Sequence, residues 1–300
     1  MKRRICLKGG EKMRITDIIS DKRPSLSFEV FPPKSTDSFD SVMESTMKIA
    51  DLMPSYMSVT YGAGGGTSRY TADIASHIKA RGVTALAHLS CISSSPSEID
   101  RLLSDLEARG IENILALRGD KPKDAPIATG HEGYKYASEL ITRIKEKGSF
   151  TVGGACYPEG HPESESLTKD IDYLKAKVDA GCDFLTTQMF FDNDILYNFM
   201  YRLLRRGVDV PVVAGIMPLT SKSQIERITA ISGNALPQRF LRIVDRYAGS
   251  PEAMKQAGIA FAIEQVIDLY ANGINAVHIY SMNKPDVAKA IRDGISEIIK

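Results

Sequence analysis

Eight short apolar segments recur along this chain, and each is followed by a stretch with helical periodicity. The segments are Ser25–Pro32, Tyr56–Gly62, Thr84–Cys91, Asn113–Asp120, Thr151–Pro158, Phe184–Phe190, Val210–Met217 and Ala276–Met282. Nearly continuous apolar runs are typical of parallel strands covered on both faces, and their alternation with helices is typical of strands joined by crossover connections. Eight such units predict a (β/α)8 TIM barrel in the α/β class.

The seventh unit is longer than the others. Helices are expected near Ser223–Ile231, Pro237–Tyr247 and Pro251–Asn272, so the barrel carries extra helices before its last strand. The chain has 300 residues, of which 43% are hydrophobic, and it shows no break in composition after Ser25. We therefore expect an N-terminal tail and lead-in over residues 1–24 and one catalytic barrel domain over 25–300.

Sequence signals mark both the N-terminal and the C-terminal ends of predicted helices. Pro96 with the pair Ser97-Glu98 is expected to open the third helix of the barrel. Four glycines follow predicted helices at positions that favour a left-handed conformation: Gly110, Gly148, Gly181 and Gly207.

Charge and cysteine content exclude several classes of protein. The 38 basic and 37 acidic residues give a net charge of +1, without the basic patch that nucleic acids or membrane surfaces require. The longest apolar runs fall short of the ~18 residues of a membrane span. Cys6, Cys91, Cys156 and Cys182 lack any metal-ligand spacing, so we expect no metal and reduced thiols in a cytoplasmic protein.

Polar side chains stand at the ends of the predicted strands, where barrel enzymes build their active sites. They are Glu29, Thr60, Tyr61, His88, Arg118, Asp120, Tyr157, Gln188 and Tyr280. The long segment from Gly119 to Gly133 follows the fourth strand and is expected to act as a lid or ligand clamp. The glycine-rich segment Tyr61–Thr67 matches neither nucleotide-binding glycine motif and is expected to be a turn.

Glu29 lies between Phe28 and Val30. Because strand side chains alternate, its carboxylate should point away from these apolar neighbours and into the barrel. A buried carboxylate without a partner takes up a proton, which suits a general acid, whereas an ion pair with an arginine from a neighbouring strand is an equal alternative.

Three further groups could contact a ligand. Arg118 and Asp120 could bind a phosphate or a polarised heterocycle, or pair with each other. Tyr157 and His161 could stack on a flat ring or donate to a phosphate. His88 could equally be a satisfied core histidine.

Asp170 and Lys177 are seven residues apart on one face of a predicted helix. They could reach a common ligand or simply face solvent.

Several motifs, in this order and spacing, resemble the methylenetetrahydrofolate reductase family. They are SFEVFPPK, SVTYGAGGGT, AHLSC, ALRGD, YPEGHPE, KVDAGCDFLTTQMFFD, GIMP and HIYSMNK. The resemblance covers the chain from about Leu26 to its end. It implies an FAD-containing barrel that passes a hydride from NADH or NADPH to 5,10-methylenetetrahydrofolate, which becomes 5-methyltetrahydrofolate for methionine synthesis.

The resemblance also implies roles for individual residues. Glu29 would protonate folate N10, and Asp120 would stabilise the cationic pterin. Positions that match FAD contacts are Thr60, His88, Arg118, Gly119, Asp120, Tyr136, Ala155, Tyr157, His161, Asp170 and Lys177. Positions that match folate contacts are Glu29, Asp120, Gln188, Gln224 and Lys284.

Two positions depart from the family pattern. Ile228 stands where relatives carry an aromatic residue that stacks on the ligand, and Lys284 occupies a position that is arginine in some relatives. Two other functions stay open: a flavin barrel similar to proline dehydrogenase, and a non-redox folate-binding or methyl-transfer barrel. The electron donor could also be a partner protein, and the chain could form a homo-oligomer.

Overall fold

The computed structural model describes residues 13–33, 38–61, 68–92, 94–120, 133–232 and 235–300. Eight parallel strands close into a barrel in chain order. They are β1 (Ser25–Val30), β2 (Tyr56–Val59), β3 (Thr84–Ser90), β4 (Asn113–Leu117), β5 (Thr151–Cys156), β6 (Phe184–Thr187), β7 (Val212–Ile216) and β8 (Ala276–Tyr280). The predicted (β/α)8 architecture is confirmed, although each strand ends slightly earlier than expected because the chain turns away to form the loops of the mouth.

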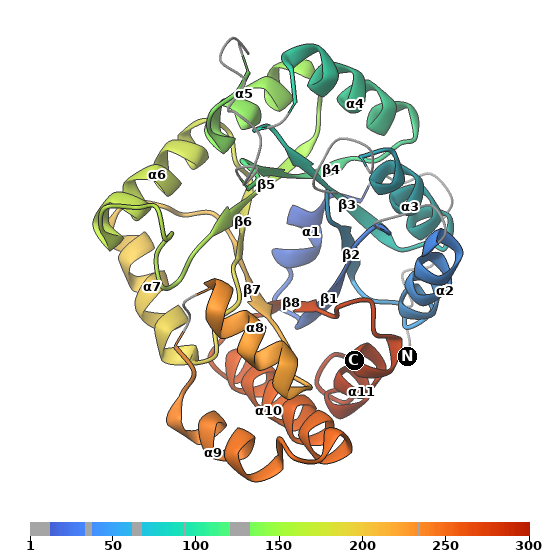
Figure 1. Cartoon of the computed structure of the whole chain (residues 1–300). Coiled ribbons are helices and arrows are strands. Elements are labelled where there is room, and N and C mark those ends of the chain that lie inside the picture. The colour runs from blue at the N-terminus through green and yellow to red at the C-terminus, as the bar shows by residue number, and fades with distance from the viewer. Residues whose placement is uncertain (1–12, 34–37, 62–67, 93, 121–132, 233–234) are drawn as a thin grey trace.

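Helices surround the strands, as Figure 1 shows in a view along the barrel. The main helices are α2 (Phe39–Ala50), α3 (Ser68–Ala80), α4 (Pro96–Ala108), α5 (Ala137–Lys147), α6 (Leu167–Asp179), α7 (Asn193–Arg205) and α11 (Pro285–Gly294). The expected additions before β8 are present as α8 (Lys222–Ser232), α9 (Gln238–Tyr247) and α10 (Pro251–Ala271).

Local signals at helix ends are mostly confirmed. α4 begins after Ser95, whose side chain accepts a hydrogen bond from the backbone N–H of Glu98. Gly110, Gly181 and Gly207 have positive φ angles of 67°, 106° and 68°. The expectation for Gly148 is wrong, because its φ of −173° is extended and the chain leaves α5 directly towards β5.

Side chains on the two faces of each strand belong to different cores, because successive strand residues point to opposite faces. Phe28 and Val30 belong to the large core between the barrel and its helices. A second core fills the barrel near the amino ends of the strands, and its members are Ile15, Ile19, Tyr56, Leu86, Leu115, Phe184, Val213 and Ala276. Ile15 and Ile19 come from α1 (Ile15–Ile19), which closes this end of the barrel (Figure 1).

The described residues also bear on the cysteines, on membrane-spanning helices and on clusters of metal-ligating side chains. Cys91, Cys156 and Cys182 are free and buried, whereas Cys6 lies outside the described residues. Across the same residues, no helix is long and apolar enough to cross a membrane, and no cluster of histidine, cysteine and carboxylate side chains could hold a metal ion.

The packing of α10 generates a first prediction. Gly258 is buried in this helix, and a Cβ atom there would overlap the backbone carbonyl oxygen of Leu219, which follows β7. Gly258→Ala should therefore lower the free energy of unfolding by about 1–3 kcal/mol, as measured by urea denaturation. Gly249→Ala is the control because nothing lies within 4 Å of its Cβ position. Equal stability of both variants would contradict close packing at Gly258.

Candidate active site

Glu29 points into the barrel from β1. The strand register places it beside Ser58 of β2 and Tyr280 of β8. Its side chain keeps 19% of its exposure, and burial raises the pKa of the carboxyl from its usual 4.5 to about 8. No lysine or arginine among the described residues forms an ion pair with it, so the alternative of a structural ion pair is not supported within these residues.

His88, on β3, lies beside Glu29. Its Nε2 atom is 3.8 Å from Oε2 of Glu29, which is too long for a hydrogen bond, and it has no other partner among the described residues. Burial lowers the pKa of His88 to about 3, so the ring is neutral at pH 7. His88 is therefore not a satisfied core histidine, because its Nε2 atom lacks a hydrogen-bond partner among the described residues.

Arg118 pairs with Glu163 rather than with Asp120. Its two terminal nitrogens lie 2.7 and 3.0 Å from the carboxylate oxygens of Glu163, in the segment after β5. This hydrogen bonding, opposed by burial, raises the pKa of Arg118. Asp120 is exposed just beyond Gly119, whose φ is 89° and whose Cβ position would overlap Ser90. The chain turns at Gly119, so Asp120 does not continue in the direction of β4.

Tyr157 and His161 form one aromatic pair after β5. Their rings meet edge to face with centroids 4.6 Å apart. The backbone N–H of Glu163 donates to Nδ1 of His161, and burial lowers the pKa of the imidazole, so Nε2 carries the proton in the neutral ring. Both rings are therefore partly buried and lie at the mouth of the barrel, after the carboxyl end of β5.

Asp170 and Lys177 do not simply face solvent from α6. Asp170 is buried, its Oδ2 atom has no hydrogen-bond partner among the described residues, and burial raises its pKa while Lys177 opposes this shift. Lys177 donates from Nζ to the carbonyl oxygen of Ala155 at 2.8 Å, and burial lowers its pKa. A buried carboxylate oxygen without a donor suits the hydroxyl group of a ligand.

A second group of predicted residues gathers at the ends of β7 and β8. Lys284 donates from Nζ to Thr220 Oγ1 at 3.2 Å, and Gln224 accepts at Oε1 from the same hydroxyl at 3.2 Å. Gln224 also donates from Nε2 to the carbonyl oxygen of Pro218. Thr220 therefore joins two residues that are 60 positions apart in sequence, a link no local pattern could indicate.

The remaining predicted residues occupy separate places. Thr60 and Gln188 are half-buried at the ends of β2 and β6, and Gln188 Oε1 accepts from the backbone of Met189. Tyr136 is 61% exposed at the start of α5. Ile228 packs in the apolar cluster formed by the added helices. Residues 62–67 of the glycine-rich segment and 121–132 of the expected lid lie outside the described residues.

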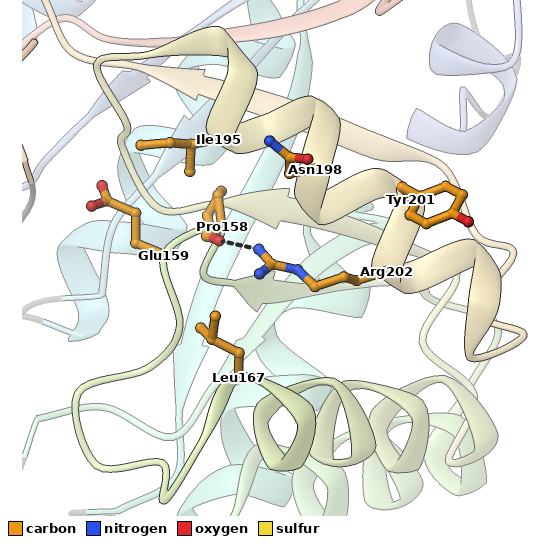
Figure 2. Close-up of a pocket in the computed structure, with 7 residues that line it drawn as sticks. All are labelled: Pro158, Glu159, Leu167, Ile195, Asn198, Tyr201 and Arg202. Atoms are coloured by element: carbon orange, nitrogen blue, oxygen red, sulfur yellow. Dashed lines mark hydrogen bonds between the residues drawn. The ribbon is translucent and has the colours of Figure 1, made fainter.

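A hollow of about 470 Å³ lies beside the barrel rather than in its mouth. Figure 2 shows it between the segment after β5 and helices α6 and α7, where Arg202 donates to the carbonyl oxygen of Pro158. None of its lining residues is a predicted site residue. The candidate site is thus the mouth of the barrel, not this hollow.

These features define a class of protein: a (β/α)8 barrel with a neutral carboxylic acid at the carboxyl ends of its strands. The methylenetetrahydrofolate reductase family model matches residues 14–296. The chain is 34% identical over 270 residues to 5,10-methylenetetrahydrofolate reductase of Pectobacterium carotovorum, covering 90% of this chain and 89% of that protein. The Escherichia coli enzyme of that name is 34% identical, with 89% of each chain covered. The chain therefore belongs to the methylenetetrahydrofolate reductase family.

Two other comparisons set the limits of this relationship. Methylenetetrahydrofolate reductase (NADH) 1 of Arabidopsis thaliana is 33% identical over 90% of this chain but only 48% of its own length. A solved structure described as an uncharacterized Clostridium thermocellum protein that binds two copies of 5-methyl-5,6,7,8-tetrahydrofolic acid has a TM-score of 0.64 and 14% identity, covering 95% of this chain and all of that one. At that identity the likeness concerns the fold alone.

The raised pKa of Glu29 predicts a pH-dependent cost in stability. In the unfolded chain the carboxyl ionises near pH 4.5, whereas in the folded protein it ionises near pH 8. Between these values the folded state holds a proton that the unfolded state has lost, so stability falls as pH rises and levels off above pH 8. Relative to Glu29→Gln, the wild type should lose about 4–5 kcal/mol across this range in urea titrations. A constant difference between the two proteins at all pH values would contradict the shift.

Proposed function

We propose that this chain reduces 5,10-methylenetetrahydrofolate to 5-methyltetrahydrofolate with FAD as cofactor and NADH or NADPH as electron donor. Membership of the family supports the folate reaction. The observation that carries the mechanism is Glu29: a carboxylic acid with a pKa of about 8, partly open to the mouth of the barrel. Such a group is protonated at neutral pH and can give its proton to a substrate.

The residues on the β3–β5 side of the mouth fit a flavin nucleotide. His88 and Asp170 each present a buried polar atom without a partner among the described residues, while Arg118 and Lys177 supply positive charge. Heterocyclic nitrogens, sugar hydroxyls and a diphosphate need this combination. The proposed contacts are Thr60, His88, Arg118, Gly119, Asp120, Tyr136, Ala155, Tyr157, His161, Asp170 and Lys177. Bound FAD would supply hydride transfer between the nicotinamide and the folate.

Glu29 holds the proton that the folate reaction consumes. We infer that it donates this proton to N10, so that the five-membered ring opens and leaves an iminium cation at N5. The carboxylate that remains on Glu29 then balances the new positive charge, and the negative charge of Asp120 adds to this stabilisation. Hydride addition to the iminium carbon produces the methyl group. After the reaction Glu29 takes up a proton again, which its raised pKa favours at neutral pH.

Residues that follow β6, β7 and β8 would hold the rest of the substrate. Gln188 would hydrogen-bond the edge of the pterin ring. Gln224, in the first turn of α8, already binds the preceding loop with its amide, so it would contact folate through its remaining N–H. Lys284 is half-buried and would meet the anionic glutamate tail as a single positive charge. Cytoplasmic location, a link to methionine synthesis, homo-oligomerisation and an electron-donating partner protein stay predictions.

The two half-reactions separate the roles of Glu29 and the flavin. Glu29→Gln keeps the size of the side chain but cannot donate a proton to N10. We expect normal FAD content and normal reduction of the flavin by NADH or NADPH, with folate reduction slower by about 10²–10⁴-fold in stopped-flow measurements. Folate turnover near the wild-type rate would remove Glu29 from the mechanism.

The pH dependence of folate reduction gives a second check. Because the protonated form of Glu29 is the active one, the rate should fall as pH rises through about 8. The reductive half-reaction does not use this proton and serves as the control. A midpoint near the ordinary pKa of 4.5 would show that Glu29 is not held as an acid before the substrate binds.

A further inference from the structure

The carboxyl end of β1, which carries Glu29, is held by hydrogen bonds on both sides. β1 ends one residue after Glu29, and its register with β8 ends at the pair Glu29 and Tyr280. On the β2 side the contact is made by backbone, since the N–H of Thr60 donates to the carbonyl oxygen of Val30 at 3.0 Å. On the β8 side the hydrogen bonds come instead from side chains of residues 281–284.

Two side chains of this segment bind the β1 backbone at Glu29 and at Phe31. Ser281 donates from Oγ to the carbonyl oxygen of Glu29 at 2.7 Å. Asn283 binds both polar backbone groups of Phe31: the N–H donates to Oδ1 at 3.0 Å, and Nδ2 donates to the carbonyl oxygen at 2.9 Å. A backbone N–H can only donate and a carbonyl oxygen can only accept, so these contacts fix the orientation of the amide. The amide of Asn283 therefore supplies the donor and the acceptor that a neighbouring strand would supply.

A turn in an uncommon conformation brings Asn283 to this place. The backbone N–H of Lys284 donates to the carbonyl oxygen of Ser281 at 3.0 Å, and the two residues between them, Met282 and Asn283, have φ angles of 54° and 52°. Positive φ at both central residues is typical of a type I′ turn, which asparagine tolerates well and methionine rarely adopts. Such conformations persist where the surrounding contacts hold them, and they are concentrated at functional sites.

The sequence after Phe31 makes this contact important for Glu29. Pro32 and Pro33 follow, and proline has no backbone N–H. Phe31 is therefore the last residue before these prolines that can bind a neighbouring segment through its amide hydrogen. Glu29 projects into the barrel only two residues earlier, and a displacement of about 1 Å in a reacting group can slow a reaction about 100-fold.

We propose that Ser281 and Asn283 are positioning residues for the folate reaction: they fix the backbone from Glu29 to Phe31 so that the carboxyl lies within reach of folate N10. Both act through Glu29, and reduction of the flavin does not depend on them. The proposal rests on the proposed function, because it concerns the proton that Glu29 gives to the folate.

The test is the oxidation of reduced holoenzyme by 5,10-methylenetetrahydrofolate in stopped-flow measurements. Asn283→Gly keeps the turn, because glycine adopts positive φ freely, but it removes both hydrogen bonds to Phe31. The limiting rate should fall by about 10–100-fold. The folate concentration that gives half of this rate, and the reduction of the flavin by the nicotinamide, should stay as in the wild type. An unchanged limiting rate in Asn283→Gly would overturn the proposal.

Met282→Gly is the matched control. It frees the backbone of the same turn but keeps both side chains that bind β1. Its limiting rate should equal that of the wild type. An equal loss in Met282→Gly and Asn283→Gly would show that backbone freedom in the turn, rather than the amide of Asn283, sets the rate, and this would contradict the proposal.

A double-mutant cycle separates positioning from a general disturbance of the barrel. Glu29→Gln leaves no proton donor to position, so the addition of Asn283→Gly should change its residual rate by less than about twofold. A further loss of about 10–100-fold in the double variant would contradict the proposal. Ser281→Ala removes only the hydroxyl that binds the carbonyl of Glu29, and it should lower the limiting rate in the same direction. This smaller change keeps the proposal testable if Asn283→Gly does not fold.

Hydrogen exchange tests the contact itself without turnover. The amide hydrogen of Phe31 should exchange faster in Asn283→Gly than in the wild type and in Met282→Gly. Equal protection in all three proteins would show that Asn283 does not hold this part of β1. A wild-type enzyme that does not oxidise its reduced flavin with this folate would instead refute the proposed function, whereas the exchange rates do not depend on that reaction.

Discussion

The placement of the Glu29 carboxyl inside a closed barrel determines the chemistry of the mouth. A carboxylate is stable where water or cations solvate it, and no lysine or arginine among the described residues pairs with this one. The group therefore keeps its proton up to about pH 8. The closed ring of strands makes this possible, because it places Glu29 between Ser58 and Tyr280 in the buried interior of the barrel.

The mouth is divided between two sets of residues from opposite sides of the barrel. Arg118, His161, Asp170 and Lys177 come from β4, β5 and α6, and they combine positive charge with an unpartnered carboxylate oxygen. Gln224 and Lys284 meet at Thr220 on the β7–β8 side. Glu29 lies on β1 with His88 beside it. A cofactor bound by the first set and a substrate bound by the second would meet over the acid.

Properties that repeat along the chain could be predicted from the sequence. The period of two indicates that Glu29 projects opposite to Phe28 and Val30, and the structure places those two side chains in the outer core. The same alternation indicates that His278 faces the barrel interior, where its ring stacks on Tyr56.

Contacts that depend on the closed register could not be predicted. Arg118 and Glu163 are separated by 45 residues, and their pairing requires β4 and β5 to lie side by side. The link through Thr220 similarly needs β7 beside β8. At Gly148 the residue type indicated a left-handed helix end, but the short connection to β5 required an extended backbone.

The central claim is that an acid at the mouth of this barrel serves a flavin that exchanges a hydride with folate. The most direct test is the anaerobic visible spectrum of the FAD-loaded protein before and after addition of 5-methyltetrahydrofolate, because this reverse reaction needs no nicotinamide. We predict that the oxidised flavin band bleaches. A flavin band that persists in excess 5-methyltetrahydrofolate, or a protein that does not retain FAD, would contradict the account.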